Sequence, residues 1–154
     1  MKTFILLSAV PGAGKSTWAS AYAASHDHVY VISSDEVRKE ITGAYQIFNQ
    51  EPLVWETFRR RIHEYGALHD DVTVIADAVN DTNTLRKYYA SEAAEFDRKM
   101  FVFINKPVDV VLAQNKMRRQ DKWVREDIID MFFKKMEQPS SEVIALYDEY
   151  LFIE

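Results

Sequence analysis

The chain has 154 residues, of which 47% are hydrophobic and 28% charged, a balance typical of one soluble globular domain. Its net charge of −5 argues against a broad duplex-binding surface, and the lack of cysteine excludes disulfides and thiolate metal sites. No apolar run approaches the roughly 18 residues that span a membrane. With no cysteine and no signal-like cleavage site, we expect a cytoplasmic protein without a membrane or obligate protein partner.

Short apolar runs alternate with longer segments of helical periodicity along the chain. The pattern predicts strands at 4–8, 29–33, 72–76, 99–104 and 150–153, and helices at 15–25, 35–43, 52 to about 66–71, 82–98, 107–117 and 125–136. The segment 42–51 is the least regular and is expected to be a loop. This alternation indicates a parallel sheet covered by helices on both faces. Because ligands bind at the carboxyl ends of the strands in such folds, the residues after each strand are the functional candidates.

The first predicted strand leads into a phosphate-binding motif at residues 9–17 (AVPGAGKST). The P-loop pattern asks for Gly, four residues and then Gly-Lys-Ser/Thr, and here Ala9 replaces only the first glycine. Glycines let backbone N–H groups converge on an anion, and the following helix adds the positive end of its dipole. Lys15 is expected to reach the β- and γ-phosphates of ATP, and the Ser16 hydroxyl to bind Mg²⁺. A chance match is the alternative, but the strand before the motif and the helix after it favour a real site. The predicted nucleotide-binding residues are Gly12, Ala13, Gly14, Lys15, Ser16 and Thr17 of this motif, together with Arg119 further along the chain.

The second strand is followed by Asp35 and Arg38, which share one face of a helix because they are three positions apart. An aspartate beside the γ-phosphate could accept the proton of an attacking hydroxyl, and the arginine could hold the acceptor or orient the aspartate. An ordinary helix cap with an exposed ion pair explains the same pattern. The residues alone leave both interpretations open.

The third strand is followed by Asp77, which fits a Walker-B-like position that orients Mg²⁺. Asn80 is a weaker candidate for contact with the substrate, and Asp81 or Thr82 is expected to cap the next helix.

Five basic residues occur in the ten positions 116–125, after the fourth strand and its helix. Arg118 and Arg119 could close over the transferring phosphate as part of a lid and stabilise its charge. A solvated helix end is the alternative, since cations also favour the negative end of a helix dipole. The run exceeds one helical turn, which favours the lid.

These motifs together resemble the 5′-hydroxyl kinase domain of phage polynucleotide kinase and its small bacterial P-loop kinase relatives of the AAA family. The most specific match is residues 11–19, where Pro precedes the glycines and Trp-Ala follows Ser-Thr. The resemblance implies that Asp35 is the general base and that Arg38 binds the acceptor side. It also implies that Asp77 and Asn80 form the family's Asp-x-x-Asn.

Further along the chain, Asn115 and Arg118 match the lid of that family, and Arg118 carries over as its arginine. Val124 departs from the proline that many relatives have at the lid's end, and the chain lacks the phosphatase domain of the phage enzyme.

We therefore expect a single three-layer α/β/α P-loop kinase domain over residues 1–154, with a five-stranded parallel sheet of order 2-3-1-4-5 and a lid around 116–125. The expected reaction is transfer of the γ-phosphoryl group of ATP, with Mg²⁺, to a hydroxyl. The acceptor is either the 5′-OH of a single-stranded polynucleotide or a small molecule such as a nucleoside, sugar or antibiotic. A non-catalytic ATP-binding switch is the remaining alternative, and the joint presence of Asp35 and Arg118 argues against it.

Overall fold

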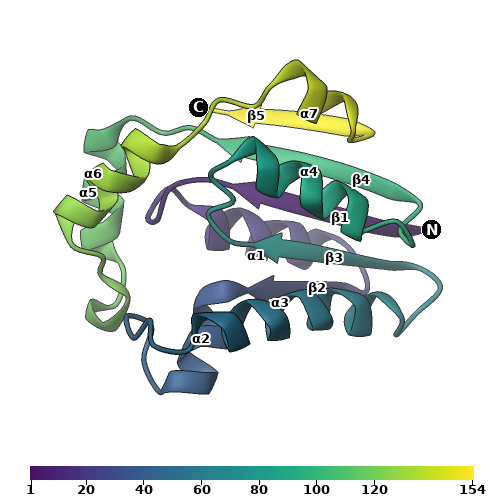
Figure 1. Ribbon diagram of the computed structural model, residues 1–154, viewed down its shortest axis with the longest axis horizontal. Coiled ribbons are helices and arrows are strands. Elements are labelled where there is room, and N and C mark those ends of the chain that lie inside the picture. Colours follow the sequence, from purple (N-terminus) through teal and green to yellow (C-terminus); the bar gives the residue numbers. More distant parts are fainter.

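The computed structural model describes residues 1–154 and contains one five-stranded parallel sheet of order β2-β3-β1-β4-β5 (Figure 1). The central strand β1 (Lys2–Ser8) lies between β3 (Val72–Asp77) and β4 (Arg98–Ile104), while β2 (Val29–Ser33) and β5 (Glu149–Ile153) form the edges. The predicted strand order is confirmed. Because all strands run the same way, their carboxyl ends share one edge of the sheet.

Alternation of side chains along β1 divides the interior into two cores. Phe4 and Leu6 point to one face and Ile5 and Leu7 to the other, and all four are fully buried. Both faces therefore need a covering layer of helices. One face is covered by α3 (Glu51–Gly66), α4 (Asn83–Glu92) and α7 (Ser141–Ala145), and the other by α1 (Lys15–Ser25), α5 (Val108–Met117) and α6 (Glu126–Lys135). The expected three-layer α/β/α architecture is confirmed (Figure 1).

The helix α3 shows why these segments fold as they do. Its apolar residues Val54, Phe58 and Ile62 recur every fourth position, so they form one buried stripe against the sheet. Gly66 continues that stripe and lets the ring of Phe96 approach the helix backbone.

Two short elements lie at the carboxyl edge of the sheet, namely α2 (Ser34–Thr42) and the 3₁₀ turn η1 (Gln120–Lys122). The side chain of Ser33 caps α2 by accepting a hydrogen bond from the backbone N–H of Glu36. Gly43 ends the same helix in the left-handed conformation, with φ of 92°.

One predicted helix boundary differs from the structure, and two short elements were not predicted. The helix expected at 82–98 ends at Glu92, because the chain turns there and places the buried Phe96 against Phe4 before β4 begins. The helix α7 and the turn η1 were not predicted, since both are shorter than two helical turns and lack a periodic apolar stripe. The structure contains no helix long and apolar enough to cross a membrane.

Candidate active site

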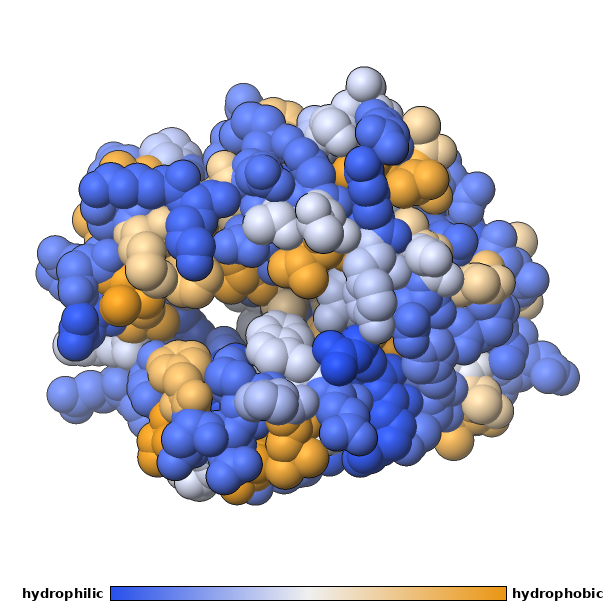
Figure 2. Space-filling view, viewed as in Figure 1, coloured by the Kyte–Doolittle hydropathy of each residue, from blue (hydrophilic) through white to orange (hydrophobic).

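A cavity of about 1120 Å³ lies at the carboxyl edge of the sheet. Figure 2 shows the molecule hollowed at this edge, with both hydrophilic and apolar side chains around the rim. The P-loop, the start of α2, the end of β3 and the segment after α5 all contribute to its walls. The sheet thus brings together segments that are far apart in the sequence, as expected for a parallel α/β fold.

The P-loop owes its shape to two glycines with positive φ, Gly12 at 86° and Gly14 at 101°. The positive φ favours glycine at position 12, and a Cβ added there would make a tight contact of 3.3 Å with the backbone oxygen of Val111. Ala9 is not among the residues with positive φ, and its N–H donates to the carbonyl of Val79 at 3.1 Å. The departure from the usual first glycine therefore requires no unusual backbone conformation.

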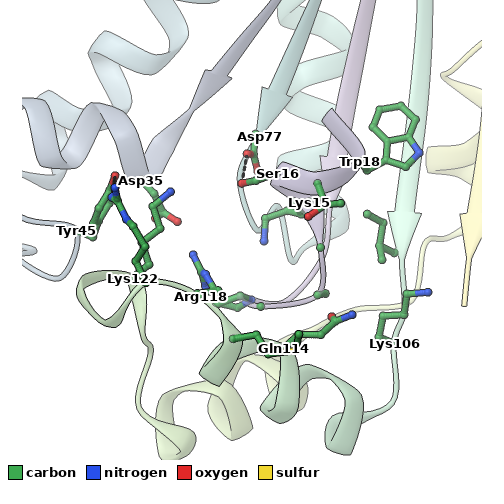
Figure 3. Close-up of a pocket in the computed structure, with 18 of the residues that line it drawn as sticks. Lys15, Ser16, Trp18, Asp35, Tyr45, Asp77, Lys106, Gln114, Arg118 and Lys122 are labelled. Carbon is green, nitrogen blue, oxygen red and sulfur yellow. Dashed lines mark hydrogen bonds between the residues drawn. The ribbon is translucent and has the colours of Figure 1, made fainter. Parts of the chain in front are cut away.

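Lys15, Ser16 and Asp77 meet at the centre of the cavity (Figure 3). The Lys15 ammonium donates to the carbonyls of Ala9 and Val10, both at 3.2 Å, and the Ser16 hydroxyl donates to Asp77 Oδ2 at 3.3 Å. Burial lowers the pKa of Lys15, although the nearby Asp77 opposes this shift. Burial raises the pKa of Asp77, and the charge of Lys15 opposes that shift in turn.

Asp35 lies on one side of the cavity and is held by Arg38. The Arg38 side chain donates to Asp35 Oδ1 at 2.9 Å and makes two parallel bonds to Glu51, at 2.9 and 2.8 Å. Its guanidinium also stacks on the exposed ring of Phe48, 4.7 Å from the ring centre. Burial disfavours the charge of Arg38, but the hydrogen bonds and charges of Glu51 and Asp35 outweigh that effect and raise its pKa. Arg38 is only 5% exposed and does not line the cavity, so its geometry fits a residue that orients Asp35.

Tyr45 connects residues 116–125, the predicted lid, to α2. Its hydroxyl donates to Glu36 at 2.8 Å and accepts from Arg119 at 3.4 Å. The ammonium groups of Lys39 and Lys122 lie 4.6 and 5.0 Å from the centre of its ring. Burial raises the pKa of Tyr45, and the bond to Glu36 adds to the shift. These contacts close one side of the cavity (Figure 3).

The lid segment is tied internally by Asn115. Its carboxamide donates to the carbonyl of Val124 at 2.8 Å and accepts from the Val124 N–H at 3.0 Å, while Trp123 Nε1 donates to the carbonyl of Arg118 at 2.8 Å. A proline at position 124 would lack the N–H that Asn115 binds, so valine suits this lid. Arg118 lines the cavity without an ion pair, which leaves its charge available to a phosphate.

Asn80 lies outside the cavity and holds the backbone. It is buried with φ of 46°, its amide donates to the carbonyl of Leu7 at 2.7 Å, and its own carbonyl accepts from Ser8 and from Arg86 at 2.8 and 3.0 Å. Arg86, which sequence reasoning missed, is fully buried and lies over the ring of Phe103. Burial lowers its pKa. Ser8, Asn80 and Arg86 thus form a buried polar cluster. Only the tertiary structure reveals it, because the sequence alone shows Arg86 as an ordinary arginine on an amphipathic helix.

The structure thus brings most of the predicted site residues to one cavity, and Arg38 and Asn80 lie behind its walls. Those that line it are Gly12, Ala13, Gly14, Lys15, Ser16, Thr17, Asp35, Asp77, Arg118 and Arg119. Sequence reasoning missed Glu51, Tyr45 and Gln114. The first two lie within the irregular segment 42–51, which was the only signal in the sequence.

A family model described as AAA domain matches residues 5–139. The chain belongs to this family. The match includes the P-loop, Asp35, Asp77 and the lid, so the predicted P-loop identity is confirmed. No curated protein matches the sequence closely enough to count as a relative.

Several solved structures share the fold of this chain. A chain of the Pnkp1/Rnl/Hen1 RNA repair complex matches with a TM-score of 0.75 and 19% identity, over 88% of this chain and 44% of that one. Kti12 from Chaetomium thermophilum, in complex with ADP-AlF3, matches with a TM-score of 0.71 and 16% identity, over 97% and 88% of the two chains. A gluconokinase from Sinorhizobium meliloti 1021 matches with a TM-score of 0.63 and 16% identity, over 97% and 81%. At these identities the similarity establishes the fold, and the chain spans less than half of the first of these neighbours.

Proposed function

We propose that the protein is an ATP-dependent phosphotransferase that uses a hydroxyl acceptor, with Asp35 as the general base. The observation that carries the proposal is the position of Asp35, whose carboxylate is fixed by Arg38 in the same cavity as Lys15 and Arg118. A module that only bound the nucleotide would need the P-loop but no oriented carboxylate beside it.

The donor half of the proposed site consists of the P-loop, Lys15 and Arg118. The loop amides and Lys15 would hold the β- and γ-phosphates, and Arg118 would stabilise the charge of the transferring group. Ser16 and Asp77 fit Mg²⁺, because they place a hydroxyl and a carboxylate oxygen 3.3 Å apart beside the phosphate position. When bound there, Mg²⁺ would neutralise charge on the phosphate oxygens. The structure has no larger cluster of metal ligands, and a kinase magnesium site needs few protein ligands because phosphates supply others.

In the proposed reaction, the acceptor oxygen attacks the γ-phosphorus while the bond to the β–γ bridging oxygen breaks, and ADP leaves. Asp35 takes the proton of the attacking hydroxyl. Arg38 orients this carboxylate through one oxygen, which leaves the other oxygen free for the proton.

The finer proposal is that the acceptor is the 5′-OH of a single-stranded polynucleotide. The motif resemblance and the fold similarity to a chain of an RNA repair complex support it. A small neutral acceptor is the second candidate, because the cations near Asp35 other than Lys15 and Arg118 are already paired with carboxylates. These ion pairs join Arg38 to Glu51, Lys39 to Asp121, Arg119 to Asp121, and Lys122 to Glu36.

A phosphoryl-transfer screen with γ-labelled ATP tests the proposal. The acceptors are a 5′-hydroxyl DNA oligomer, the matching RNA, and panels of nucleosides and sugars. Transfer to an oligomer should weaken steeply as salt rises, whereas transfer to a neutral small molecule should depend little on salt.

Asp35→Asn should lower kcat about 10²- to 10⁴-fold without weakening ATP binding, since it removes only the base. The matched control is Asp109→Asn, because Asp109 is exposed on α5 and lies outside the cavity. Full turnover by Asp35→Asn would refute the base assignment. Unchanged ATP affinity in Lys15→Ala would refute the nucleotide site.

A further inference from the structure

Gln114 carries the one buried side-chain polar atom that has no hydrogen-bond partner in the protein, its Oε1. A buried acceptor without a partner loses its hydrogen bonds to water and gains none in return, so such atoms are rare. Gln114 also lines the cavity of the candidate active site. Since the last torsion of a glutamine side chain is broad, the carboxamide can turn towards a ligand at small cost. A bound molecule could therefore provide the donor that the protein does not.

The position of Gln114 identifies which part of a nucleotide it would meet. In Figure 3, Asp35 lies on one side of Lys15 and Arg118, whereas Trp18 and Lys106 lie on the other, with Gln114 beneath the P-loop on the way to Lys106. In an in-line transfer, the acceptor and the leaving nucleotide lie on opposite sides of the transferring phosphoryl group. The nucleoside of the donor is thus expected at the end of the cavity opposite Asp35.

The lining of this end suits a planar base. Ile104 and Ile153 provide apolar surface from the carboxyl ends of two neighbouring strands, and Trp18 adds a half-buried aromatic ring from α1. Such a mixture of apolar walls and a few polar groups is typical of sites that bind small molecules. Gln114 adds an uncharged hydrogen-bonding side chain to this lining.

The unsatisfied atom is an acceptor, which distinguishes between bases. Adenine presents an exocyclic amino group, a donor, where guanine presents the acceptor O6. Gln114 Oε1 can accept a hydrogen bond from the amino group of adenine, whereas O6 of guanine has no hydrogen to donate. We propose that Gln114 recognises the base of the donor nucleotide and makes the site prefer ATP over GTP. This inference rests on the nucleotide site of the proposed function, and it adds a specificity that the P-loop does not provide because that loop contacts only phosphates.

Two variants at one position separate the acceptor role from a structural one. Gln114→Leu removes the carboxamide, whereas Gln114→Glu keeps an acceptor and removes the amide donor. The control is Gln50→Leu, the same change at an exposed glutamine outside the cavity whose side chain makes no capping hydrogen bond to α3. Calorimetric titration with Mg·ATP and Mg·GTP gives the affinity ratio, and thermal unfolding without nucleotide gives the stability of each variant.

We expect the wild-type protein and Gln50→Leu to bind ATP more tightly than GTP. Gln114→Leu should weaken ATP binding about 3- to 10-fold, the effect of one hydrogen bond, with little change for GTP. Gln114→Glu should keep the preference for ATP. The melting temperature of Gln114→Leu without nucleotide should not fall, because the variant removes an unsatisfied buried group.

Equal affinity of the wild-type protein for ATP and GTP would overturn the inference. The inference would also be overturned if Gln114→Leu left the ratio of ATP to GTP affinity unchanged, whether or not its melting temperature fell. Loss of the preference for ATP in Gln114→Glu would overturn it as well. The proposed function has its own test. If the wild-type protein bound neither ATP nor GTP, the nucleotide site itself would be refuted. Normal binding with an unchanged ratio in Gln114→Leu removes only the role of Gln114.

Discussion

Replacement of Glu51 by glutamine tests whether the network behind Asp35 is needed for both stability and catalysis. Arg38 is nearly fully buried, and Glu51 neutralises it through two charge-assisted bonds of 2.9 and 2.8 Å. Such bonds contribute about 1.5–3 kcal/mol each, and glutamine preserves one acceptor while it removes the charge. Because Asp35 still pairs with Arg38, we expect Glu51→Gln to lower the free energy of unfolding by about 1–2 kcal/mol.

Urea denaturation followed by circular dichroism measures this change, with a lower midpoint at an unchanged slope as the expected result. The matched control is Glu40→Gln, since Glu40 pairs with Arg61 near the surface and its loss should cost less than about 1 kcal/mol. Phosphoryl transfer by Glu51→Gln should also fall about 10-fold, because Arg38 would orient Asp35 less well. Equal destabilisation by the two glutamine variants would refute the assignment of Glu51 as the anchor of Arg38, and full activity would refute its effect on Asp35.

Two further predictions concern the scaffold. A Cβ on Gly66 would lie 2.6 Å from Cζ of the buried Phe96, so Gly66→Ala should lower the free energy of unfolding by about 1–2 kcal/mol. In the same urea assay, the double variant Gly66→Ala/Phe96→Leu should regain part of that lost stability. His63 bridges α3 to Glu92 and Glu95 on and after α4, and although burial alone would lower its pKa, the two carboxylates raise it. Because the folded pKa exceeds the ordinary value of 6.5, this stabilisation is complete below pH 6.5 and is lost as pH rises through the folded pKa. His63→Gln should flatten that pH dependence of the melting temperature, and an unaltered profile would contradict the assignment.

Much of the fold could be predicted because its signals are local. The helix at Lys15–Ser25 and the strand at Val29–Ser33 match the predicted bounds, since glycines, apolar runs and a cap mark their ends. The helix expected at 82–98 was predicted too long, because the turn before Phe96 depends on its packing against Phe4 and Gly66. The sequence contains no local signal for that contact.

For the candidate site, the sequence by itself determined which chemical groups are present and near which strand ends they lie. Lys15, Ser16, Asp35, Asp77 and Arg118 follow from motif spacing, because a parallel sheet gathers the ends of its strands at one edge. Only the tertiary structure decided how those groups are paired. The spacing of Asp35 and Arg38 predicted that they share a face, and this holds, but the same spacing could not show that Arg38 is buried.

The partners of Arg38 and Asn80 are contributed by segments remote in sequence. Glu51 reaches Arg38 from the next helix, and Leu7 binds Asn80 across the sheet. Hydrogen bonds of this kind depend on distances between elements, which side-chain periodicity does not encode. The sequence therefore determines the phosphate-binding loop and its neighbouring carboxylates, while tertiary packing decides that Arg38 supports Asp35, that Asn80 supports the backbone, and that Gln114 is left without a partner.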